Sequence, residues 1–272
     1  MSLYEIMDEI TAKQILKTET GENRLFGLLT GIVTENYEKE MPGRVCVQIP
    51  VRDENANVLK WARAVMPSGG EDWGHYFLPE VGDQVVLAFE EGNIEKPYII
   101  GCIPKDNSKL LSSSADADNQ YKRIRTKHGS GITFVDSKDS EDGEKDKIQI
   151  QTAKGLHGIN LDNEKNRITV CDKDQKNAIT IRTEDGRIEV AAEKKLTIKV
   201  GDSIEITMNG ENGTVNLNCG TLKAKVQKTL HMEVNGNGSL KASSGLTLEG
   251  GGQVKLSSNG QTSIGGSLIK VG

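Results

Sequence analysis

Proline and aromatic residues are absent from the second half of this chain. The last proline is Pro104 and the last aromatic residue is Phe134, although the chain has 272 residues. Aromatic rings bury more area per residue than other side chains, so a globular domain of this length normally uses some of them in its core. Proline cannot donate to a central β-ladder. These absences predict that the chain after Phe134 is β-structure with a core too thin for rings.

Other absences exclude several classes of protein. No apolar run approaches the roughly 18 residues needed to span a bilayer. Residues 1–14 carry acids where a secretory signal has a basic start and a continuous apolar core. The net charge of −5 disfavours non-specific binding to nucleic acid. We therefore expect synthesis in the cytoplasm without a signal peptide, and no nucleic-acid partner.

Cysteine and histidine are too scattered to indicate a reactive or metal-binding site. The four cysteines form no CxxC pair, which indicates reduced structural thiols. The four histidines form no HxH, HExxH or Cys-His pair. The acidic stretch 136–146 fails the EF-hand spacing, because Lys138 would occupy the first ligand position. The sequence predicts no catalytic residue, no cofactor and no metal ligand.

From Lys147 onward one pattern returns roughly every 8–11 residues, an alternating segment followed by a corner rich in Gly, Asn, Asp or Ser. Polar residues such as Gln149, Thr180 and Glu205 stand between aliphatic ones, so each strand is predicted to have an inner and an outer face. The aliphatic positions that predict the core are Ile148, Ile150, Ile159, Leu161, Ile168, Val170, Ile179, Ile181, Ile188, Val190, Leu196, Ile198, Ile204, Ile206, Val215, Leu217, Leu230, Met232, Val234, Leu246, Leu248, Val254 and Leu256.

A strand with only two or three inward aliphatic residues must be stacked in a long series to form a core. Two closed arrangements satisfy this condition: a single-chain β-solenoid and an intertwined homotrimer. Periodicity alone does not decide between them. The ring-free core favours the homotrimer, in which the aliphatic side chains of residues 122–272 meet near an axis and each stabilises by roughly 1.5–3 kcal/mol.

The segment before the repeat has a different composition. Residues 25–104 contain five predicted strands, the number and size of an OB barrel, and we expect Trp61, Trp73, Tyr76, Phe77 and Phe89 to fill its core. Residues 105–121 are rich in Ser and Asp and predict a linker. Residues 1–24 predict a short helical lead-in, with apolar residues on one face. The expected fold class is all-β, an OB barrel followed by an intertwined triple-stranded β-helix.

The stretch from Pro79 to Pro104 resembles the OB-fold signature of contractile-tail spike proteins, the bacteriophage baseplate assembly protein V family and the VgrG proteins of type VI secretion. The residues that carry the resemblance are Trp61, Pro79, Gly82, Asp83, Val85, Phe89, Gly92, Pro97, Tyr98, Ile100 and Gly101. Downstream, the segment that begins at Arg123 is similar to that family's transition from OB fold to β-helix.

The resemblance implies a homotrimeric needle under a tail tube, in the baseplate of a tail-like particle, that sheath contraction drives through an envelope. Contact with a target membrane would be transient. VgrG proteins carry a hub region before the OB fold, so the 24 residues here imply a separate hub protein at the tube end. The end of the chain implies docking of a PAAR-type tip protein on Ile269, Val271 and Gly272. No lysozyme domain fits in the 105–121 linker.

Two other functions remain open from the residues alone. A β-helical tailspike that cleaves polysaccharide needs two carboxylates about 5–10 Å apart. Outward acids such as Glu189, Glu205 and Glu233 are present, but the shaft has no aromatic platform for a sugar. An OB module for single-stranded nucleic acid could stack bases on Trp61, Trp73 and Tyr76, but no basic groove accompanies them.

Overall fold

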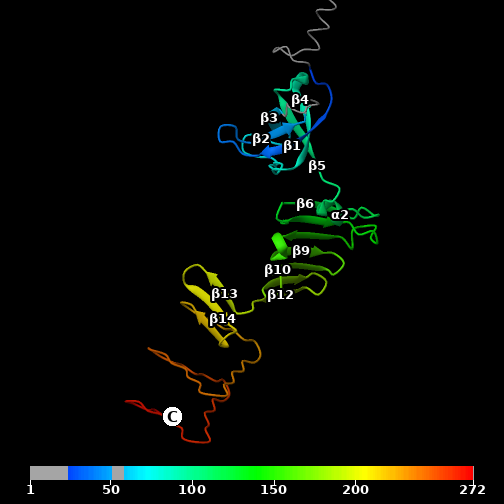
Figure 1. Cartoon of the computed structure of the whole chain (residues 1–272). Helices are drawn as coiled ribbons and strands as arrows, with labels where there is room; N and C mark the ends of the chain where they lie inside the picture. Colours follow the sequence, from blue (N-terminus) through cyan, green and yellow to red (C-terminus); the bar gives the residue numbers. More distant parts are fainter. Residues whose placement is uncertain (1–23, 51–57, 272) are drawn as a thin grey trace, which may run out of the picture. The chain divides into compact units, whose positions relative to one another are not determined.

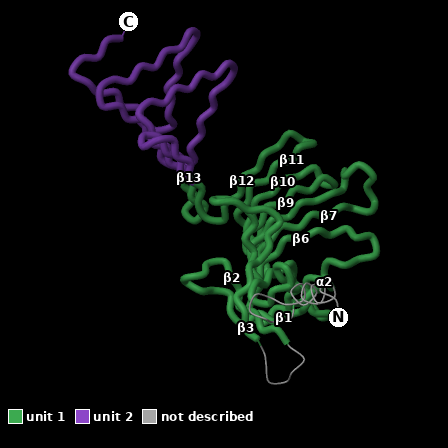
Figure 2. The backbone as a smooth tube through the Cα atoms, turned by 90° about the horizontal axis from the view of Figure 1, so that it is seen from above, with its two compact units in different colours: residues 1–196, 208–214 green, residues 197–207, 215–272 purple. Residues whose placement is uncertain are grey.

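The computed structural model describes residues 24–50 and 58–271. The chain divides into two compact units, Met1–Leu196 with Met208–Thr214, and Thr197–Thr207 with Val215–Gly272 (Figure 2). The helical lead-in predicted over residues 1–24 lies outside the described residues except for Arg24. Among the described residues no helix is both long and apolar enough to cross a membrane.

The first folded element is a closed five-stranded barrel (Figure 1). Its strands are β1 (Leu29–Glu35), β2 (Arg44–Ile49), β3 (Val58–Ala64), β4 (Gln84–Phe89) and β5 (Pro97–Ile103), and they pair in the order β1-β2-β3-β5-β4. Neighbours are antiparallel except for β3 and β5, which are parallel. The closed barrel confirms the prediction of a five-stranded OB block.

Small aliphatic residues, and not aromatic ones, fill the barrel. The buried cluster consists of Val33, Val45, Val47, Ile49, Ala62, Val85, Leu87 and Ile99. The expectation that five aromatic residues form this core was therefore wrong. Trp73, Tyr76 and Phe77 are 64–67% exposed on the loop before β4, and Phe89 packs against the edge of the cluster. Three of the five aromatic residues lie on a loop and not on a barrel strand, and the buried positions of the strands are occupied by small and branched aliphatic residues.

A short helix, α2 (Lys109–Ser114), lies inside the segment predicted as a linker. It contacts β6, where the Arg123 guanidinium donates to the Ser113 carbonyl oxygen at 2.7 Å. The same guanidinium lies 4.7 Å from the centre of the Tyr121 ring. A serine-rich segment gave no helical periodicity in the sequence, so this packing on the first strand of the next sheet was not predicted.

The second folded element is a seven-stranded antiparallel sheet (Figure 1). Its strands are β6 (Tyr121–Arg125), β7 (Gly131–Val135), β8 (Lys147–Gln151), β9 (His157–Asp162), β10 (Arg167–Asp172), β11 (Ala178–Arg182) and β12 (Arg187–Ala191). Each strand pairs with the next strand in the chain. The predicted alternation of strands and corners from Lys147 is therefore present in β8 to β12, and β6 and β7 form a hairpin before it.

The backbone pairing corrects one part of the predicted needle. Strands β8 to β12 form their ladders within one chain, whereas an intertwined β-helix was expected to use ladders between chains from Ile148 onward. A tight turn places each strand beside the one before it. Successive strands joined in this way therefore pair as an antiparallel meander. Intertwining stays a prediction for the segments that follow this sheet.

A three-stranded sheet follows, in the order β13 (Lys195–Val200), β14 (Ile204–Asn209) and β15 (Thr214–Asn218). Residues 219–271 continue as exposed chain with neither helix nor strand assigned in that range. The aliphatic repeat nevertheless persists there, with side chains such as Leu230 and Leu248 more than half exposed. Within a single chain this segment buries no core.

Replacement of a barrel-core residue tests which side chains hold the OB block together. We expect Leu87→Ala to lower the free energy of unfolding of the barrel by about 2–5 kcal/mol, because the Leu87 side chain is fully buried and its removal leaves a cavity. The matched control Leu59→Ala, at a position 57% exposed, should change it by less than about 0.5 kcal/mol. Urea unfolding followed by Trp61 fluorescence measures both, and equal losses would contradict the assigned core.

Candidate assembly surface

The register of the seven-stranded sheet brings the predicted aliphatic positions into two rows on one face. Ile148 lies opposite Leu161, and the row continues through Ile168, Ile181 and Ile188. Two residues along each strand, a parallel row is formed by Ile150, Ile159, Val170, Ile179 and Val190. We call these ten residues the aliphatic face. The rows extend onto β7 and β6 through Phe134, Ile132 and Ile124, which the sequence analysis had not included.

The aliphatic face is largely open to solvent in the single chain. Ile159 is 36% exposed, Val190 52% and Ile188 67%. A contiguous apolar face of this kind marks an interaction surface, since soluble proteins rarely leave such a face uncovered. The sheet therefore leaves an apolar face uncovered in the single chain.

The opposite face of the sheet is polar, because aliphatic and polar residues alternate along each strand. Its central row runs from Gln149 through Asn160, Thr169 and Thr180 to Glu189. Ion pairs lie beside this row, such as Lys147 Nζ at 2.6 Å from Glu164 Oε2 and 3.6 Å from Asp162 Oδ2. The hydrogen bond to Glu164 and the charge of Asp162 raise the pKa of Lys147.

Hydrogen bonds link successive turns on both sides of the sheet where the strands end. On one of these sides the Asn163 side chain donates to the Gly143 carbonyl oxygen at 2.7 Å, and Thr183 N donates to the Asn166 carbonyl oxygen at 2.9 Å. On the other side Lys173 N donates to the Leu156 carbonyl oxygen at 3.0 Å. Each bond joins turns that lie two strands apart, so it supports the register that aligns the aliphatic rows.

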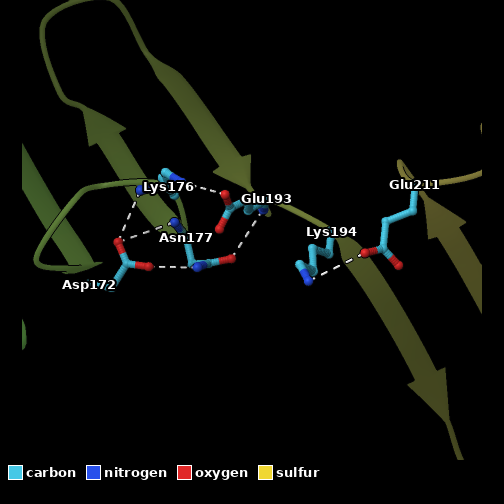
Figure 3. A network of polar contacts seen from close by, with 6 residues as sticks. All are labelled: Asp172, Lys176, Asn177, Glu193, Lys194 and Glu211. Carbon is cyan, nitrogen blue, oxygen red and sulfur yellow. Dashed lines mark hydrogen bonds and ion pairs between the residues drawn. The ribbon is translucent and has the colours of Figure 1, made fainter.

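The most extensive of these connections surrounds Asp172 (Figure 3). The Asp172 carboxylate accepts hydrogen bonds from the Lys176 amide at 3.0 Å and from the Asn177 side chain at 2.6 Å. The side-chain oxygen Oδ1 of Asn177 in turn accepts from the Glu193 backbone amide at 3.1 Å, and Lys176 Nζ forms an ion pair with Glu193 at 2.5 Å. We call these four residues the turn clamp. Sequence reasoning missed it because its partners lie in different corners of the repeat.

The remaining predicted core positions are not brought together in the single chain. Leu196, Ile198, Ile204, Ile206, Val215 and Leu217 belong to the three-stranded sheet. Leu230, Met232, Val234, Leu246, Leu248, Val254 and Leu256 are 53–82% exposed in the extended segment. The predicted tip-docking residues Ile269 and Val271 are 52% and 94% exposed, and Gly272 lies outside the described residues.

The signature residues Pro79, Gly82 and Asp83 form the turn that leads into β4. The Asp83 carboxylate accepts the Glu80 amide at 2.9 Å, which closes the turn. Gly82 has φ of 90°, a conformation that favours glycine, and its amide donates to the Val33 carbonyl oxygen at 2.8 Å. Pro79 itself is buried. This turn fixes the barrel at the point where β1 and β4 meet.

Phe89, Pro97 and Tyr98 form the connection between β4 and β5. Phe89 and Pro97 are cross-strand partners. The Tyr98 hydroxyl donates to Glu90 Oε2 at 2.6 Å, and this bond is the main cause of a lowered pKa of the Glu90 carboxyl. These contacts join the end of β4 to the start of β5.

Two further signature residues also lie on barrel strands. Trp61 on β3 lies opposite Cys46, and Gly101 on β5 lies opposite Val86 beside a shift in register. The signature is thus a set of barrel-forming residues. Among the described residues no group of three or more His, Cys, Asp or Glu is placed to hold a metal ion.

Comparison with known proteins agrees with this geometry. Residues 29–103, which span β1 to β5, match the family model of the type VI secretion system/phage-baseplate injector OB domain. The chain therefore carries an injector OB domain. It is similar to the type VI secretion system spike proteins VgrG5, at 29% identity over 94 residues, and VgrG1a, at 25% over 120 residues, both of Pseudomonas aeruginosa PAO1.

These matches confirm the resemblance to the VgrG-like spike family that the signature residues predicted. They cover 32% and 44% of this chain but only 12% and 17% of the two relatives. The chain thus corresponds to a small part of the length of the spike proteins it matches. A baseplate and spike role is supported at low identity.

Acid titration tests the turn clamp. The hydrogen bond from Asn177 lowers the pKa of Asp172 below its ordinary value of 3.8. Because the folded pKa is lowered, the clamp stabilises the turn above the ordinary pKa and is lost as the pH falls through the lowered one. We expect the nuclear magnetic resonance signal of the Asn177 side-chain amide to move in that acid range.

Two variants separate the clamp from general acid effects. Asp172→Ala should abolish this acid-dependent change and lower the melting temperature. Asp174→Ala removes an acid from the same turn whose carboxylate accepts no hydrogen bond from any described residue, and should preserve the change. An Asn177 signal that titrates identically in both variants would contradict the clamp.

Proposed function

We propose that this chain is the subunit of a homotrimeric central spike in a contractile injection system. Three copies would bury their aliphatic faces against one another and form a rigid shaft below the OB barrels. Sheath contraction would drive this shaft through a target envelope. The observation that carries the proposal is the aliphatic face, a continuous apolar surface on strands β8 to β12 of a chain whose residues 29–103 match an injector OB domain.

Three-fold association suits the dimensions of this surface. Each strand offers only two aliphatic side chains, as Val170 and Ile168 on β10 show, so one sheet packed on another would leave a thin and incompletely filled core. Three sheets around an axis bring branched side chains from all sides and need no rings. The exposed repeat of residues 219–271 would obtain its ladder partners from the neighbouring copies.

A spike also needs connections at its ends. We propose that the barrel end binds a hub protein at the tail tube and that the far end, with Ile269 and Val271, binds a tip protein of PAAR type. Exposed apolar side chains are available at both places, since Phe26 is 68% and Val271 94% exposed. The contact with a membrane would be mechanical and brief.

The two rival functions find less support. The outward acid Glu189 is neutralised by Arg182 and Arg187, and Glu233 lies beside His231, so neither belongs to a carboxylate pair of the glycosidase type. The exposed aromatic residues Trp73, Tyr76 and Phe77 could stack bases, but Glu71 and Asp72 immediately precede Trp73. A glycan-hydrolysis screen and a low-salt titration with single-stranded DNA should both be negative.

Measurement of the mass in solution tests the trimer. Sedimentation equilibrium should give three times 29.6 kDa, or 88.8 kDa. Small-angle scattering should in addition show an elongated particle. A stable monomer, or a compact particle of that mass, would contradict the spike.

Substitution on the aliphatic face tests how the copies associate. We expect Ile179→Asp to prevent trimer formation, because it would bury three unpaired carboxylates in one layer. In the single chain Ile179 is 46% exposed, so the barrel should still fold. The control Thr180→Asp places the same charge on the opposite face one residue away and should preserve the trimer. Equal effects of both variants would contradict the assignment of faces, and an unaffected trimer in both would contradict the interface.

A further inference from the structure

Charge is distributed unevenly along the chain. Residues 1–120 carry 11 basic and 20 acidic side chains, whereas residues 121–191, which contain the seven-stranded sheet, carry 14 and 13. Residues 219–272 carry six lysines and two glutamates, with neither aspartate nor arginine. We call this last range the basic segment. An asymmetry of this kind between parts of one chain points to an interaction with an anionic surface.

The basic segment cannot neutralise its own charge, however it folds. Two glutamates can pair with at most two of the six lysines, so at least four lysines of each chain have no acid within the segment. All six are exposed in the single chain. In the seven-stranded sheet, by contrast, acids are almost as numerous as bases, and lysines such as Lys147 and Lys176 pair with acids of the same chain. Three copies side by side would triple the excess of positive charge.

Most of these lysines alternate with the aliphatic positions of the repeat. Lys255 stands between Val254 and Leu256, and Lys241 directly follows Leu240. Neighbouring residues of an extended strand point to opposite faces. If the aliphatic side chains face the axis of the proposed shaft, these lysines face outward. Their ammonium groups would then remain in solvent, where an anionic partner can reach them.

The composition of the segment indicates which anionic partner fits. Proteins that bind nucleic acid use arginine for phosphates and base edges, and aromatic rings for stacking on bases. The chain has no arginine after Arg187 and no aromatic residue after Phe134. Lysines combined with exposed aliphatic side chains suit a surface that presents phosphate above an apolar layer. Phospholipid headgroups have this chemistry.

We propose that the basic segment binds the anionic phospholipid headgroups of a target membrane through its lysine ammonium groups. This contact rests on the proposed spike and adds an electrostatic attraction to its mechanical action. Each lysine binds weakly, because salt screens exposed charges beyond about 10 Å at 0.1 M, but many lysines on three chains act together. The acidic residues 1–120 would be repelled by the same surface, so the attraction would also orient the particle.

Vesicles of two compositions test the attraction. The full chain is sedimented with vesicles of phosphatidylcholine alone and with vesicles of equal parts phosphatidylcholine and phosphatidylglycerol. At low salt we expect binding to the anionic vesicles to be about tenfold tighter, and the preference should disappear as sodium chloride is added, because exposed charges are screened. Equal binding to both vesicles would show apolar insertion without charge recognition. That result, or a preference that salt does not weaken, would overturn the proposal.

Two triple variants with the same net charge locate the contact. The first removes three lysines of the basic segment: Lys223→Gln, Lys241→Gln and Lys255→Gln. The control removes three from the connections between strands of the seven-stranded sheet: Lys145→Gln, Lys165→Gln and Lys173→Gln. The first should reduce the preference for anionic vesicles to less than about threefold, and the control should retain it. Equal losses would show attraction by overall charge and overturn the assignment to the segment. If the first variant no longer has the mass of the unmodified chain, the salt dependence of the unmodified chain decides.

A duplex DNA oligonucleotide tests the other class of anionic partner. At equal phosphate concentration it should not displace the chain from anionic vesicles, and displacement would favour nucleic acid and overturn the membrane contact. The outcome is separable from that of the spike. A monomeric mass with a preference for anionic vesicles would keep the lipid contact and remove the shaft. A trimer without that preference would keep the spike and remove the lipid contact.

Discussion

The structure depends on one constraint, the need to cover an apolar sheet face that the chain cannot cover itself. Two rows of branched side chains cross the seven-stranded sheet, and no helix or second sheet of the described chain is assigned to pack on them. In most domains a helix or a second sheet fulfils this task. In the proposed trimer, association would bury this face, and the stability of the shaft would then depend on its assembly. The barrel differs, because Val47, Leu87 and the rest of its core are fully buried within one chain.

The register of the strands aligns the aliphatic residues in continuous rows on the uncovered face. A shift of one residue in any ladder would move its aliphatic pair to the polar side, because side chains alternate between faces. The turns resist such shifts, as the bonds from Thr183 to Asn166 and from Lys173 to Leu156 show. The turn clamp around Asp172 adds a connection beyond β12. The hydrogen bonds between the turns therefore support the register of the strands. That register places the aliphatic side chains on one face, as the proposed assembly requires.

Much of this fold could be predicted from the sequence, because its main signals are local. Alternation identified the strands from Ile148 to Val190, and turn residues identified their corners. The OB barrel followed from a family signature whose residues close its turns. The interior of the barrel was predicted wrongly, since hydrophobicity alone does not reveal that Trp73 and Tyr76 lie on the loop before β4 and not on a barrel strand. The turn clamp joins Glu193 to three residues of the preceding corner, so it has no signal within one strand.

The same geometry accounts for a contrast between the two faces of the sheet. In the proposed trimer every position of the aliphatic face would serve association, so a polar substitution there would be costly. The polar face is free of that demand, so its side chains need only be soluble. Thr169 is 7% exposed at the centre of that face, yet among the described residues no buried side-chain oxygen or nitrogen lacks a partner, so its hydroxyl still reaches water. Charged side chains beside it are paired, as Lys147 is with Asp162 and Glu164. The polar face therefore meets water with satisfied groups, whereas the aliphatic face keeps apolar area exposed in the single chain.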